Sequence, residues 1–103
     1  MVLEVNDNNL EEVFSKGKIT VLDFYADWCG PCRMYSPIIH KFSEDNPDIG
    51  VAKINVDSNS ELAATYGVRG IPTTILLLNG RMVTKVPGVV PQLKLEEFTN
   101  NLK

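Results

Sequence analysis

Cys29 and Cys32 are the residues of this sequence best suited to chemistry, and they are its only cysteines. A structural disulfide framework would need more cysteines at longer separations. A zinc site needs about four ligands, which this pair and the single histidine, His40, do not supply. The close spacing instead suits a disulfide that opens and closes, so we expect redox chemistry and no bound metal.

The sequence around the pair predicts how the two thiols differ. A β-branched, mostly apolar segment over residues 19–25 precedes Cys29, and apolar residues then recur at helical spacing from Tyr35 to Phe42, in a helix running to about residue 46. The cysteines therefore lie where a buried strand passes into a helix, whose N-terminal N–H groups and partial positive charge favour a thiolate. We expect Cys29 to be exposed and nucleophilic, and Cys32, one turn further, to be shielded and resolving.

The remaining sequence predicts the elements that position this junction. Strands separated by helices predict right-handed parallel crossovers, and Asn79-Gly80 between two apolar segments predicts an antiparallel hairpin. The order is therefore βαβαβ, then a hairpin and a C-terminal helix, which gives an α/β fold with a mixed sheet in a single domain over residues 1–103. The other predicted strands cover residues 51–56, 73–78 and 81–86. The other predicted helices are one that carries Leu10, Val13 and Phe14 and ends at Gly17, one from residue 58 to Gly67, and a last one that carries Leu95, Phe98 and Leu102.

Composition excludes several classes of function. Hydrophobic residues make up 44% of the chain and charged residues 22%, the balance of an ordinary globular domain. The net charge is −3 and the basic residues are scattered, so we expect no nucleic-acid or membrane-binding surface. No apolar run approaches the roughly 20 residues that span a bilayer. The first residues lack a basic segment followed by an apolar stretch, so we expect no secretory signal and a cytoplasmic protein.

Several stretches of the sequence resemble the thioredoxin family, in the family's order and over essentially the whole chain. They are Val21-Leu22-Asp23-Phe24, Ala26-Asp27-Trp28-Cys29-Gly30-Pro31-Cys32, Pro37, Ala52-Lys53-Ile54-Asn55-Val56-Asp57, Tyr66-Gly67-Val68-Arg69-Gly70-Ile71-Pro72-Thr73 and Asn79-Gly80. The resemblance implies a three-layer α/β/α sandwich around a central mixed sheet. It also implies a general protein disulfide reductase, in which Cys29 attacks a target disulfide and Cys32 resolves the mixed disulfide.

The resemblance implies roles for residues around the dithiol. Asp23 would be a buried carboxylate beneath Cys32 that takes its proton, although a tolerated edge position is the alternative for a charge in this strand. Lys53 would pair with Asp23, although its long side chain could equally reach solvent. Gly30 and Pro31, between the cysteines, would tune the redox potential.

Other residues would bind the target. Trp28 would be a contact surface at the rim of the site, and Ile71 and Pro72 would face the dithiol across a cis peptide bond, against a base rate of about 5–6% cis for X–Pro bonds. Gly88 would help to hold an extended target segment, bound by strand-like backbone hydrogen bonds. The sequence departs from the common family pattern at Tyr25, often a tryptophan, at Arg33, usually a lysine, and at Pro87, which precedes Gly88.

The implied partners are disulfide-containing target proteins and an NADPH-dependent thioredoxin reductase, and we expect a monomer. The chain has no Gly-rich dinucleotide motif, so we expect it to bind no cofactor itself. Two alternatives remain. An oxidase or isomerase domain on the same fold would typically carry a histidine between the cysteines, where this chain has Gly30-Pro31. A binding module that serves as a subunit of a larger complex would keep its function after loss of both cysteines.

Overall fold

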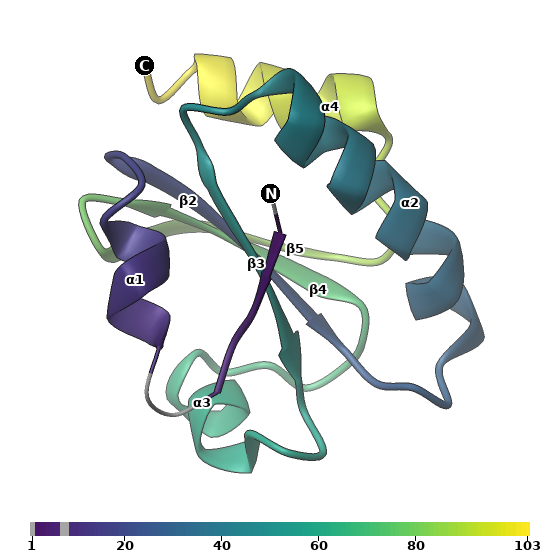
Figure 1. The fold of residues 1–103 in the computed structure, drawn as a ribbon. Helices are drawn as coiled ribbons and strands as arrows, with labels where there is room; N and C mark the ends of the chain where they lie inside the picture. Colours follow the sequence, from purple (N-terminus) through teal and green to yellow (C-terminus); the bar gives the residue numbers. More distant parts are fainter. Residues whose placement is uncertain (1, 7–8) are drawn as a thin grey trace.

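A five-stranded mixed sheet runs through the residues that the computed structural model describes, 2–6 and 9–103 (Figure 1). The elements are β1 (Val2–Glu4), α1 (Leu10–Phe14), β2 (Ile19–Tyr25), α2 (Gly30–Asp45), β3 (Gly50–Asn55), α3 (Ser60–Thr65), β4 (Thr73–Leu78), β5 (Arg81–Pro87) and α4 (Gln92–Asn100). The strands lie in the order β1-β3-β2-β4-β5. The three-residue β1 escaped prediction because a strand this short has no readable alternation, whereas the predicted α/β fold class is confirmed.

The central strand, β2, is buried on both faces, which explains its nearly continuous apolar run. Val21 lies in a core cluster with side chains of α2 and α4, whereas Leu22 lies in a second cluster with side chains of α1 and α3. The sheet therefore separates two helical layers. Because successive side chains of a strand alternate between faces, Asp23 points to the same face as Val21, toward α2.

The predicted parallel arrangement is confirmed for the first pair of strands joined through a helix and is wrong for β4. β2 and β3, joined through α2, are parallel, but β4 runs antiparallel to β2. The reason is that α3 has only six residues and spans about 9 Å, whereas a six-residue strand spans about 20 Å. The chain thus returns to the end of the sheet that it left, where Tyr25 pairs with Asn55 and Phe24 pairs with Thr73.

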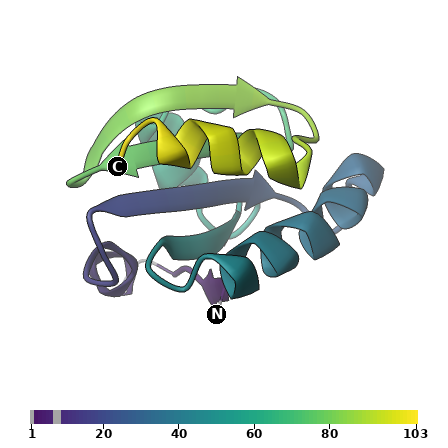
Figure 2. The ribbon, with the colours of Figure 1, turned by 90° about the horizontal axis from the view of Figure 1, so that it is seen from above.

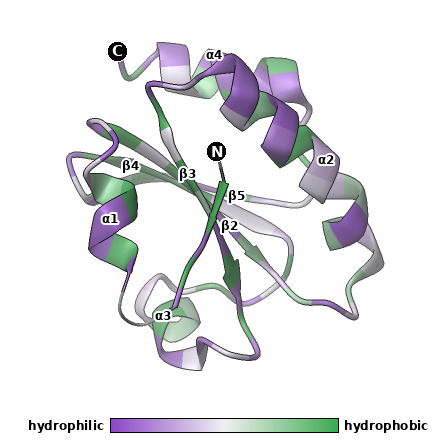
Figure 3. Cartoon of the chain, in the orientation of Figure 1, coloured by the Kyte–Doolittle hydropathy of each residue, from purple (hydrophilic) through white to green (hydrophobic). Residues whose placement is uncertain are grey.

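Helix α2 carries a buried face and a solvent face, as its predicted spacing requires. Figure 3 shows hydrophobic residues concentrated in the strands, while α2 mixes hydrophobic and hydrophilic residues. Tyr35, Ile39 and Phe42 are fully buried against the sheet, and Pro31 lies in the first turn, where its missing N–H has no helical partner. In the described part of the chain, no helix combines the length and apolar character that crossing a membrane requires.

Candidate active site

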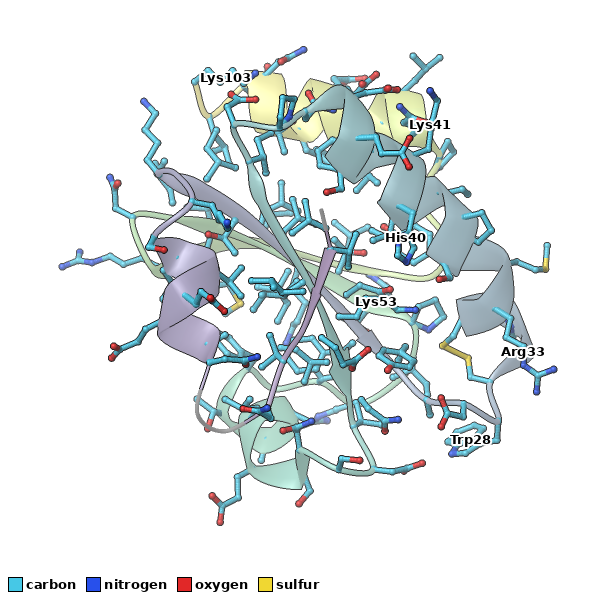
Figure 4. All side chains as sticks on the ribbon, viewed as in Figure 1. Trp28, Arg33, His40, Lys41, Lys53 and Lys103 are labelled. Carbon is cyan, nitrogen blue, oxygen red and sulfur yellow. A yellow bond between two sulfur atoms is a disulfide. The ribbon has the colours of Figure 1, made fainter. Side chains whose placement is uncertain are left out.

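The two cysteines lie at the junction of β2 and α2 and are joined by a disulfide, with their Cα atoms 5.2 Å apart. Figure 2 shows β2 pointing toward the first turn of α2, and Figure 4 shows the sulfur–sulfur bond close to Trp28 and Arg33. Cys29 is the N-cap residue of the helix, with an extended backbone, and Cys32 lies within the first turn. The predicted strand-to-helix junction is confirmed.

Both cysteines are only 4% exposed, so Cys32 is shielded as expected, but the expected exposure of Cys29 is wrong. The reason is that Val56 and Ile71, from the segments that follow β3 and precede β4, pack against the pair. The two sulfurs differ in their polar surroundings instead. Cys29 Sγ accepts a hydrogen bond of 3.2 Å from the backbone N–H of Cys32, and it lies 3.9 Å from the carbonyl oxygen of Ile71.

The predicted target-binding residues Ile71, Pro72 and Gly88 are brought together, and Ile71 packs against the cysteine pair. The Ile71–Pro72 peptide bond is cis, as the resemblance implied. The backbone N–H of Gly88 donates to the Pro72 carbonyl at 2.8 Å, which fastens the end of β5 to the start of β4. Gly88 has φ +87°, a backbone conformation that favours glycine, so a substitution there would strain the loop.

Trp28 is 67% exposed at the rim of the site. Its indole Nε1–H donates to a carboxylate oxygen of Asp57 at 2.9 Å, which holds the ring although it is mostly in solvent. Asp57 was not predicted as a site residue. Asp57 ends one of the stretches that resemble the family, directly after a predicted strand, but nothing in the spacing links it to Trp28, 29 residues earlier in the sequence.

Asp23 is 1% exposed, and neither of its carboxylate oxygens has a hydrogen-bond partner among the described residues. Burial raises the pKa of this carboxyl from 3.8 to about 7, while the positive charge of Lys53 lowers it and the negative charge of Glu4 raises it slightly. Burial thus dominates. A carboxyl with a pKa near neutrality can both accept and release a proton under ordinary conditions.

The predicted ion pair between Asp23 and Lys53 is not formed, although the two residues are neighbours in the β2–β3 register. Lys53 Nζ donates to Ser36 Oγ of α2 at 2.9 Å and lies 4.4 Å from the centre of the Tyr25 ring. The lysine therefore influences Asp23 through its charge alone. Ser36 was not predicted as a site residue, though its position four residues after Cys32 places both on one helix face.

A buried pair of hydroxyl groups, from Thr74 and Tyr35, lies next to Asp23. Thr74 is the β4 partner of Asp23 in the register, and its hydroxyl is 2.7 Å from the hydroxyl of Tyr35 on α2. Both side chains are fully buried, and burial raises the pKa of Tyr35. No group of three or more His, Cys, Asp or Glu side chains in the described ranges is placed to hold a metal.

Comparison with known proteins gives one family. A family model described as Thioredoxin matches residues 1–101. Thioredoxin from Chlamydia pneumoniae is 42% identical over 102 residues, which cover 99% of this chain and 95% of that protein. Thioredoxin from Haemophilus influenzae is 40% identical over 101 residues, or 96% of this chain and 94% of that protein. The structure of a mutant thioredoxin from Halobacterium salinarum matches with a TM-score of 0.91 and 40% identity, covering 98% of this chain and 89% of that one.

Proposed function

The chain belongs to the thioredoxin family and is a protein disulfide reductase, in which we propose that Cys29 is the attacking thiol and Cys32 the resolving thiol. The observation that carries the assignment is the hydrogen bond from the Cys32 backbone N–H to Cys29 Sγ at the helix N-terminus. A bond of this kind stabilises a sulfur anion, and the thiolate is the form that attacks a disulfide. Cys32 Sγ has no such donor among the hydrogen bonds of the described residues.

The exchange proceeds in two steps. The Cys29 thiolate attacks one sulfur of the target disulfide, the target's S–S bond breaks, and its other sulfur leaves as a thiolate. Cys32 then loses its proton and attacks Cys29 Sγ, which releases the second target sulfur as a thiolate and forms the Cys29–Cys32 disulfide. The target gains two electrons, and the dithiol of this protein is oxidised.

Asp23 accepts the Cys32 proton in this proposal. A base works best when its pKa lies near the working pH, and burial brings the pKa of Asp23 to about 7. Asp23 lies on the α2 side of the sheet, where α2 carries Cys32 in its first turn. Lys53 favours the ionised, proton-accepting form of Asp23 through its charge. Gly30 and Pro31, which lie between the two cysteines, set the redox potential of the disulfide.

Family members act on protein disulfides and are returned to the dithiol form by a reductase. For this chain the proposed reductase is NADPH-dependent, and the proposed form is a cytoplasmic monomer with one domain. The test is a coupled assay of NADPH oxidation with a thioredoxin reductase and insulin as the target. The parent chain should sustain turnover, and the Cys29→Ser, Cys32→Ser double variant should give none. Equal turnover by the two proteins would overturn the proposal.

Trp28 contributes to docking of the target. Replacing it by alanine removes an exposed aromatic surface beside the dithiol but leaves the sulfurs and their hydrogen bond in place, so we expect a KM for insulin about tenfold higher and a nearly unchanged kcat. The matched control is Met82→Ala, which removes an exposed apolar side chain at the hairpin end of β5, away from the dithiol. An equal rise in KM in both variants would contradict a specific role for Trp28.

A further inference from the structure

We propose that Ser36 is a positioning residue which, together with the Tyr25 ring, holds the Lys53 ammonium group away from Asp23. The inference rests on the proposed role of Asp23 as the proton acceptor of Cys32. It concerns a residue outside the dithiol and its target-binding rim. Its effect on the exchange passes entirely through the position of one charge.

Two contacts fix the ammonium group at a distance from the carboxylate. Ser36 Oγ accepts a hydrogen bond from Lys53 Nζ at 2.9 Å, and the Tyr25 ring lies 4.4 Å from the same nitrogen, within cation–π range. Tyr25 is itself held, because its hydroxyl donates to a carboxylate oxygen of Glu4 at 2.7 Å. Lys53 and Asp23 are register partners, yet both oxygens of Asp23 lack a hydrogen-bond partner among the described residues.

The serine couples this arrangement to the resolving cysteine. Ser36 lies one turn beyond Cys32 on the same face of α2, and both residues line a hollow of about 280 Å³. Tyr25, Lys53 and the charged residues Asp27 and Arg33 complete its wall. Figure 4 shows Lys53 extending from β3 toward α2. The ammonium group thus lies at a hollow that Cys32 also lines.

The position of Lys53 matters because it is the cation among the groups that act on Asp23. Lys53 on β3 lowers the pKa of Asp23 and Glu4 on β1 raises it. Two further groups face Asp23: Tyr35 on α2, whose own pKa the Asp23 charge raises, and the uncharged Thr74 on β4. A positive charge stabilises a carboxylate more strongly as it approaches, most of all where water is excluded. Contact with the ammonium would lower the pKa of Asp23 and make it a weaker base toward Cys32.

The test is the Ser36→Ala variant, with the pKa of Asp23 measured by ¹³C NMR titration of its carboxyl carbon in the oxidised protein. Without its hydroxyl acceptor, the ammonium is expected to turn to the neighbouring carboxylate, and the pKa of Asp23 should fall by about one pH unit. Ser36→Thr, which retains a hydroxyl, should stay near the parent value. Ser58→Ala, at an exposed serine outside the hollow, should match the parent.

A double-mutant comparison separates positioning from a general disturbance of α2. In a Lys53→Met background, Ser36→Ala should no longer change the pKa of Asp23. In stopped-flow measurements of mixed-disulfide resolution, the acid limb of the pH–rate profile should move to lower pH in Ser36→Ala by the same amount as the pKa. An unchanged or raised pKa in Ser36→Ala, or a fall that persists without Lys53, would overturn the inference. Neither result would touch the assignment of Cys29 and Cys32, which the insulin assay tests separately.

Discussion

Cys29→Ser should reduce insulin disulfides no faster than the uncatalysed background, whereas Cys32→Ser should still attack its targets and accumulate as a mixed disulfide with them. The difference follows from the helix N-terminus, where Cys29 Sγ accepts a hydrogen bond from the backbone N–H of Cys32. A serine at position 29 removes the nucleophile itself, but a serine at position 32 removes only the group that releases the target. Insulin precipitation measures the first effect, and mass spectrometry without reductant measures the second.

Alkylation of the reduced protein supplies an independent check on these roles. Iodoacetamide reacts with thiolates, so Cys29 should be modified at least about tenfold faster than Cys32 at neutral pH. The two single serine variants provide the matched controls, since each leaves one thiol to be modified. Faster modification of Cys32, or trapping of targets by Cys29→Ser, would show that the two roles are reversed.

Asp23→Ala should make the oxidised protein more stable at pH 7, although it removes a buried side chain. The carboxyl is 1% exposed and has no hydrogen-bond partner among the described residues, so its ionisation in the folded state is unfavourable. The pKa of 3.8 in an unfolded chain rises to about 7 on folding, chiefly through burial. Ionisation therefore costs the fold about 4 kcal/mol at neutral pH, and we expect alanine to recover roughly 2–4 kcal/mol after the loss of packing.

The sign of the pH dependence follows from the same two pKa values. Between them the folded state holds a proton that the unfolded state has released, so stability falls as pH rises from about 4 to about 7. Below this window both states are protonated and the cost is absent. Asp23→Ala should abolish this fall, whereas Glu44→Ala, at an exposed carboxylate of α2, should keep it.

Urea melts at several pH values would measure the stability effect, and stopped-flow kinetics of the reduced proteins would measure the functional one. Loss of the proton acceptor should slow the resolution of mixed disulfides by about 10²-fold, within the usual range for a general base. An Asp23→Ala protein that is less stable than the parent at pH 7 would contradict the destabilising role of the carboxylate. Resolution at the parent rate would instead contradict its role as the base.

Much of the fold could be predicted because local signals agreed with the tertiary structure. The apolar run over β2 reflects burial on both faces, and the helical spacing after Cys29 reflects one face packed on the sheet. The direction of β4 could not be predicted from alternation of strands and helices. It depends on how far α3 carries the chain back along the sheet, which is a matter of helix length rather than helix presence.

The sequence predicted which residues form the site, but not how their side chains contact one another. The cysteine pair and the target-binding residues follow from motifs, and the structure brings Cys29, Ile71, Pro72 and Gly88 to one end of the sheet. The burial of Cys29 and the hydrogen bond from Lys53 to Ser36 are set by side chains from different segments. Side-chain choices of this kind depend on tertiary neighbours, which spacing along one segment does not encode.

The return of β4 to the end of the sheet where β2 finishes also sets the order in which the parts of the site are completed during synthesis. Both cysteines are synthesised early in translation, whereas Ile71 and Pro72 are added about 40 residues later and Gly88 later still. Until β4 emerges, one edge of β2 is unpaired and the dithiol lacks one wall of its pocket. A nascent chain therefore contains the dithiol and its helix before the residues proposed to bind the target, and that part of the site is complete only after Gly88 has been made.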